Sequence, residues 1–83
     1  MVNITLYTRK NCHLCDEAKA DLAALQEKYP HRLAEIDIES DSALLAAHKE
    51  TIPVIEVGPY VLRAPIRKED LVMTIGAAID RQD

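Results

Sequence analysis

The chain has 83 residues, of which 48% are hydrophobic, and its formal net charge is −4. This length predicts one small domain over residues 1–83, and the hydrophobic content excludes an intrinsically disordered chain. The short apolar runs exclude a membrane span, and the negative charge argues against a nucleic-acid-binding protein, which would carry a basic face.

Apolar patterning predicts alternating strands and helices along the chain. A strand over Val2–Tyr7 alternates apolar and polar side chains. A helix over Cys12–Tyr29 follows, because apolar residues recur on one face until Pro30 stops it. The later predicted elements are, in chain order, a strand Arg32–Ile38, a short helix capped by Ser40 or Asp41 and reaching His48, strands Pro53–Val57 and Tyr60–Arg63, and a helix from about Arg67.

The predicted order of elements is βαβαββα. The helix between the first two strands is long enough for a right-handed parallel crossover. Gly58-Pro59 marks a turn that makes the last two strands an antiparallel hairpin. The sequence therefore predicts an α/β chain with a thioredoxin-like fold, a four-stranded mixed sheet flanked by three helices.

The two cysteines, Cys12 and Cys15, lie where the first strand ends and the first helix begins. Two cysteines are too few for a disulfide scaffold, and this spacing is typical of a reactive dithiol. A free thiol ionises near a pKa of about 8.5, and the helix N-terminus, with Arg9 and Lys10 beside it, would lower the pKa of Cys12. We expect Cys12 to be the nucleophile and Cys15, one turn further on, to resolve its mixed disulfide.

Two further features flank this chemistry. His13 lies between the cysteines, where a cationic imidazole would stabilise a thiolate, although a solvent-facing residue without a role fits the sequence equally well. Pro53 opens a predicted strand, and its bond to Ile52 is either an ordinary strand entrance or a cis peptide bond.

The cysteine pair at a strand-to-helix junction, the later Thr51-Ile52-Pro53-Val54 and the closing hairpin and helix resemble glutaredoxins over essentially the whole chain. The resemblance implies that Pro53 is cis and that the backbone of Ile52, beside Thr51, contacts the substrate. It also implies that Lys10 or Arg9 binds a glutathione carboxylate.

The chain departs from the glutaredoxin pattern at two places. His13-Leu14 replaces the usual Pro-Tyr between the cysteines, and Arg63-Ala64-Pro65-Ile66 lacks the Gly-Gly pair that holds the γ-glutamyl end of glutathione in that family. The resemblance therefore predicts redox chemistry, but glutathione specificity does not follow from it.

We expect a thiol–disulfide oxidoreductase that contributes to cell redox homeostasis. The expected partners are glutathione, as a co-substrate, or protein disulfides, with a thioredoxin-reductase-type donor as the other possible reductant. We expect no metal, no tightly bound cofactor and a monomer, and the absence of a secretory signal favours the cytoplasm.

Two alternatives stay open. The first is a metal or iron–sulfur protein in which two chains each contribute Cys12 to a shared cluster. The second is a non-catalytic module that binds partners beside Pro53. His31 and His48 are expected to be exposed residues at helix ends or in loops.

Overall fold

The computed structural model describes residues 1–81 and has the element order βαβαββα. Its strands form one four-stranded sheet in the order β2-β1-β3-β4. Strands β1 and β2 run parallel, whereas the pairs β1–β3 and β3–β4 run antiparallel. The mixed sheet predicted from the sequence is therefore confirmed. The strands are β1 (Val2–Thr8), β2 (His31–Asp37), β3 (Val54–Val57) and β4 (Tyr60–Arg63).

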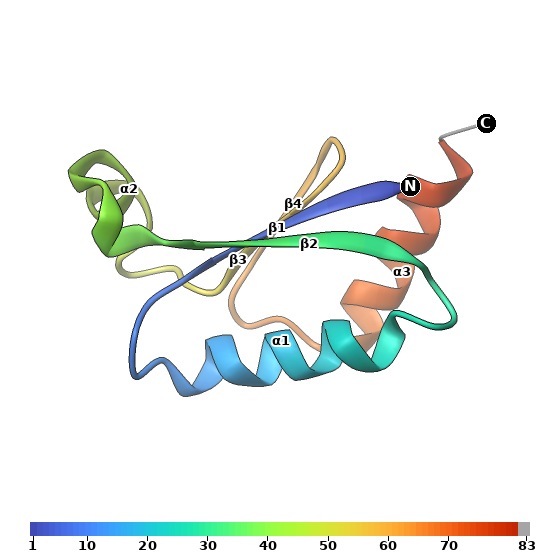
Figure 1. Cartoon of the computed structure of the whole chain (residues 1–83), viewed down its shortest axis with the longest axis horizontal. Coiled ribbons are helices and arrows are strands. Elements are labelled where there is room, and N and C mark those ends of the chain that lie inside the picture. The colour runs from blue at the N-terminus through green and yellow to red at the C-terminus, as the bar shows by residue number, and fades with distance from the viewer. Residues whose placement is uncertain (82–83) are drawn as a thin grey trace.

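Three α-helices accompany the sheet: α1 (His13–Leu25), α2 (Ser42–His48) and α3 (Lys68–Asp80). Helices α1 and α3 lie on the same side of the sheet, and α2 lies at the end where β1 and β2 finish (Figure 1). The short α2 follows a 3₁₀ turn over Ile38–Ser40 and is capped by Asp41, whose carboxylate accepts from the Ala43 N–H at 2.7 Å.

The core follows from the two-residue period of the strands. In β1, Val2, Ile4 and Leu6 are 3%, 1% and 0% exposed, and they face α1 and α3. The alternate β1 residues point to the opposite face of the sheet, which carries more polar side chains. The helices complete the core with Ala18, Leu22, Leu25, Leu71, Ile75 and Ala78.

Helix α1 ends at Leu25, earlier than the predicted Tyr29. The Gln26 N–H bonds to the Ala23 carbonyl at 3.3 Å, which tightens the last turn. The Gln26 side chain then accepts from the backbone N–H of His31 at 2.7 Å. Pro30 disfavours helical backbone at Tyr29, so the segment between α1 and β2 is a turn.

His31 is buried, and the expectation of an exposed loop residue is wrong. The residue opens β2 opposite Val2 on the core face of the sheet and is 3% exposed. Its Nδ1 lies 2.7 Å from the Tyr29 carbonyl oxygen. The strand was predicted to begin one residue later, at Arg32, so His31 was assigned to a loop and its burial was not predicted.

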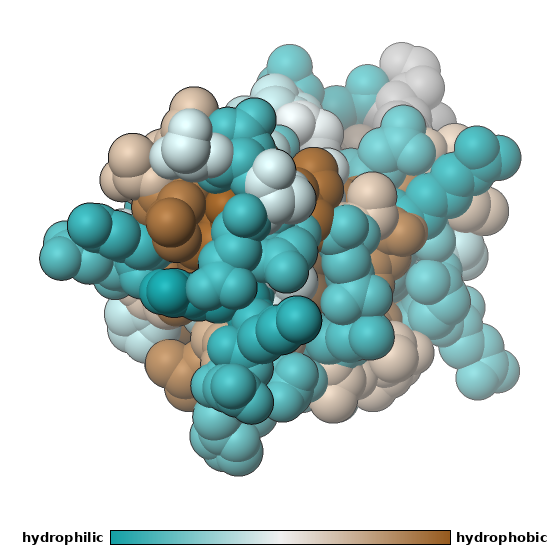
Figure 2. Space-filling model, turned by 60° about the vertical axis from the view of Figure 1, so that its left-hand side comes forward, coloured by the Kyte–Doolittle hydropathy of each residue, from teal (hydrophilic) through white to brown (hydrophobic). Residues whose placement is uncertain are grey.

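Hydrophilic side chains dominate the surface around the α2 end of the molecule, and apolar ones form separate patches between them (Figure 2). Within residues 1–81, the large hydrophobic side chains that are exposed are Met1, Leu14, Val61 and Met73. No helix in this part of the chain combines the length and the apolar character that crossing a membrane requires.

Candidate functional site

The cysteine pair lies at the turn between β1 and α1, as predicted. Asn11 adopts a φ of 60°, a left-handed conformation that asparagine tolerates. Cys12 then takes an extended backbone conformation and becomes the N-cap of α1. Its Sγ accepts a hydrogen bond from the Cys15 N–H at 3.2 Å, and the two cysteines form a disulfide. The sulfur of Cys12 therefore lies among the backbone N–H groups that begin the helix.

The two cysteines differ in exposure. Cys12 is partly exposed, whereas Cys15 is 1% exposed and faces the interior from the first turn of α1. Their Cα atoms are 5.2 Å apart. An external reactant therefore reaches Cys12 more readily than Cys15.

The charged residues around Cys12 have different surroundings. The His13 side chain is 86% exposed, and its Nε2 lies 3.7 Å from Oε1 of Glu17. Arg9 forms an ion pair with Glu39, with 2.8 Å between Nε and Oε1. Lys10 is exposed and has no ion pair within residues 1–81. Of the two basic residues, Lys10 is thus the one whose charge is not already paired.

The loop before β3 is held by one carbonyl group. The backbone N–H groups of Thr51 and Ile52 donate to the His48 carbonyl at 2.9 and 3.1 Å, and the Thr51 hydroxyl donates to it at 3.3 Å. The peptide bond between Ile52 and Pro53 is cis. The Ile52 N–H, which the family resemblance assigns to the substrate, is therefore bonded within the chain in this structure.

The cysteine turn and this loop lie at the same end of the sheet. Tyr7 of β1 pairs with Val54 of β3 in an antiparallel register, so the end of β1 meets the beginning of β3. Cys12 follows β1 by a short turn, and Pro53 directly precedes Val54. The topology brings together Cys12, Cys15, Lys10, Thr51, Ile52 and Pro53 at this end, while Arg9 is directed to Glu39.

A polar cluster beneath the loop was not predicted from the sequence. The Tyr7 hydroxyl donates to Glu56 at 3.0 Å, and the Tyr7 and His48 rings are 4.8 Å apart between centroids. Burial, the hydrogen bond to Glu56 and the negative charge of that carboxylate all raise the pKa of Tyr7. Strand alternation indicates that Tyr7 and Glu56 avoid the core, but their proximity depends on the pairing of β1 with β3.

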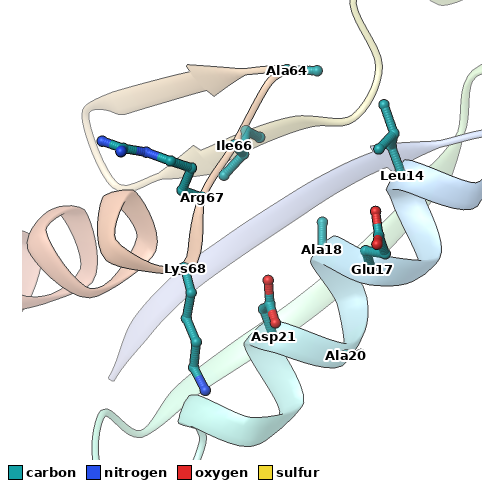
Figure 3. A pocket seen from close by; sticks show the side chains of 9 residues that line it. All are labelled: Leu14, Glu17, Ala18, Ala20, Asp21, Ala64, Ile66, Arg67 and Lys68. Atoms are coloured by element: carbon teal, nitrogen blue, oxygen red, sulfur yellow. The ribbon is translucent and has the colours of Figure 1, made fainter.

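A groove of about 320 Å³ lies between α1 and the segment that joins β4 to α3. It begins at Leu14, between the two cysteines, and continues along α1 past Glu17 to Asp21 (Figure 3). Ala64, Ile66 and Lys68 form its other side. Ala64 precedes a second cis peptide bond, to Pro65. No sequence pattern indicated this groove, because two segments far apart in the chain form it.

Potential metal ligands are not gathered in this region. Within the part of the chain that the structure describes, no group of three or more histidine, cysteine, aspartate or glutamate side chains is arranged to hold a metal ion.

Comparison with known proteins agrees with this geometry. A family model described as "Glutaredoxin-like domain (DUF836)" matches residues 3–76. The structural genomics target protein XcR50 from X. campestris is similar, with 32% identity and a TM-score of 0.76, over 89% of this chain and 96% of that chain. Protein Ne2328 from Nitrosomonas europaea has 28% identity and a TM-score of 0.73, over 92% and 88% of the two chains. A search of curated proteins gave no match.

A more distant structure supports the fold. A mutant thioredoxin from Halobacterium salinarum has 18% identity and a TM-score of 0.73, over 93% of this chain and 74% of that chain. Together with the Cys12–Cys15 disulfide, the match to the glutaredoxin-like family model indicates a redox function. Because the family model matches most of its residues, this chain belongs to the glutaredoxin-like domain family (DUF836).

Proposed function

We propose that the chain is a thiol–disulfide oxidoreductase that works through its Cys12–Cys15 pair. The observation that carries the proposal is a disulfide at a helix N-terminus between one partly exposed and one buried cysteine. In the reduced protein, the helix dipole and the Cys15 N–H that now donates to Cys12 would stabilise a Cys12 thiolate. We therefore expect a pKa below about 8.5 for the Cys12 thiol.

The reaction proceeds in two exchanges. The Cys12 thiolate attacks one sulfur of a substrate disulfide, which forms a mixed disulfide and releases the other sulfur as a thiolate that takes up a proton. The Cys15 thiolate then attacks the Cys12 sulfur, which releases the second substrate thiol and forms the Cys12–Cys15 bond. The substrate gains two electrons and two protons, and the protein loses them.

The loop beside the cysteines would orient the substrate. We propose that Thr51, Ile52 and Pro53 form the backbone surface against which the substrate lies, and that Lys10 binds a carboxylate on it. The Ile52 N–H already donates to the His48 carbonyl. A substrate that binds the Ile52 backbone must therefore either replace this hydrogen bond or bond to the Ile52 carbonyl instead. The His13 side chain, 86% exposed, is accessible to a substrate charge.

Alkylation of the reduced protein tests the mechanism. The rate of reaction of Cys12 with iodoacetamide, followed against pH, should have its midpoint below about 8.5. The Cys12→Ser variant should lack the fast reaction, whereas Cys15→Ser should retain it. A midpoint at the value of an ordinary thiol, or a fast phase that survives in Cys12→Ser, would refute the assignment.

The oxidised protein needs a thiol or dithiol reductant to complete the cycle. The unpaired charge of Lys10 favours glutathione, with its two carboxylates, as this donor. The oxidised protein would be offered reduced glutathione in one assay and a thioredoxin reductase system in another, with the Cys12–Cys15 dithiol measured in both. Reduction by the reductase system and not by glutathione would reverse this preference.

A further inference from the structure

The groove beside α1 begins at a residue between the two cysteines of the candidate active site. Leu14, at its beginning, lies between Cys12 and Cys15 and is 53% exposed. On the other side, the Ala64 N–H donates to the Pro53 carbonyl at 3.1 Å, which joins the groove to the cis-proline loop. A chain bonded to Cys12 would therefore find the beginning of this groove two residues further along, at Leu14.

Two acidic and two basic side chains line the groove. The carboxylates of Glu17 and Asp21, one turn apart on α1, point into the gap (Figure 3). Arg67 points away from α1 (Figure 3), and its Nε lies 3.7 Å from Oδ2 of Asp70. The Asp70 carboxylate therefore partly neutralises the charge of Arg67. Lys68 is the cation on the far side. Asp21 has no ion pair within residues 1–81, which leaves its charge available to a ligand.

The first part of the groove is apolar. Leu14 and Ala18 line it on α1, and Ile66 faces them from the segment before α3 (Figure 3). A bound chain would cover the exposed Leu14 side chain, and removing this apolar surface from water would favour binding. The groove thus offers an apolar contact near the cysteines and two carboxylates further along the helix.

We propose that this groove binds the segment of a protein substrate next to its reactive cysteine, and that Glu17 and Asp21 hold a lysine or arginine of that segment. The proposal rests on the oxidoreductase function and names its substrate class. Glu17 and Asp21 lie five and nine residues beyond Cys12 along α1, so the midpoint between them is about 10 Å from Cys12 at 1.5 Å per residue. An extended chain covers this distance in about three residues, which places the basic residue about three positions from the substrate cysteine.

The test uses the full chain with Cys15→Ser, so that Cys12 retains its partner as a mixed disulfide. Three peptides carry a single cysteine and differ only in lysine, glutamine or glutamate three positions away, in two sets that place this residue before or after the cysteine. Each cysteine is activated as a thionitrobenzoate disulfide. Attack by Cys12 on the peptide sulfur forms the mixed disulfide and releases coloured thionitrobenzoate, whose absorbance gives the rate.

At low salt, the lysine peptide of one set should react about fivefold faster than its glutamine counterpart, as expected of two exposed charge pairs. High salt should bring this ratio close to one. The ratio, unlike a single rate, is insensitive to changes in the reactivity of Cys12. Lysine-to-glutamine ratios near one in both sets at low salt would overturn the proposal.

Two double variants in the same background separate the groove from overall charge. Glu17→Gln with Asp21→Asn should remove the preference for lysine. Glu27→Gln with Asp80→Asn makes the same change at exposed positions outside the groove and should preserve it. An equal loss in both variants would overturn the groove assignment. If Cys12 reacts with every peptide no faster than free cysteine, the oxidoreductase function itself fails, a result distinct from fast but unselective reaction.

Discussion

The two sides of the candidate site differ in how firmly the chain holds their side chains. The cysteine turn places Lys10, His13 and Leu14 on the surface. The loop opposite is tied to the His48 carbonyl by two backbone N–H groups and leads into Val54, which is 1% exposed. The proposed nucleophile therefore lies on an accessible turn, while a buried strand fixes the loop beside it.

This difference predicts unequal effects of truncation on stability, the largest effect we expect. Val54→Ala removes buried methyl groups beside Pro53 and should lower the free energy of unfolding by about 2 kcal/mol. Leu14→Ala, at a site that is 53% exposed, should change it by less than about 0.5 kcal/mol. Urea unfolding of the oxidised proteins measures both values. Equal losses in the two variants would contradict the contrast between the two sides.

Local sequence patterns predicted the fold because the spacing of apolar residues along the chain distinguishes strands from helices. Alternation in Val2–Tyr7 places Val2, Ile4 and Leu6 on one face, and the structure buries all three. The position of the cysteines at the start of a helix could also be predicted from neighbouring residues alone. The end of α1 was missed because it depends on a hydrogen bond from His31 to the Gln26 side chain, which no helical period reveals.

Contacts between distant segments account for the rest of the site. Arg9 was expected near the substrate, but it pairs with Glu39, 30 residues away in the sequence. Tyr7 meets Glu56, 49 residues away, because the β1–β3 register makes them diagonal neighbours. A single sequence predicts strands without fixing which residues lie opposite one another, so these pairs and the groove beside α1 emerge only from the structure.

On the firmly held side, we expect Tyr7 to titrate later than an ordinary tyrosine, a smaller effect than the difference in stability. Tyr7→Phe removes the hydrogen bond to Glu56 and should lower the free energy of unfolding by about 1 kcal/mol near neutral pH. Because the pKa of Tyr7 is raised in the folded protein, its contribution to stability is fully present below the ordinary tyrosine pKa of about 10. This contribution is lost as the pH rises through the higher folded value.

Tyrosinate absorbance followed against pH measures this titration directly. The folded protein should show a step later than an unfolded tyrosine, and Tyr7→Phe should lack it. Glu56→Gln removes the negative charge that opposes ionisation and should move the step to lower pH, although burial of the phenol, the largest cause, remains. If the late step persists in Tyr7→Phe, Tyr7 is not held beneath the loop as described. The loop would then rest on the His48 carbonyl bonds without the ring contact between Tyr7 and His48.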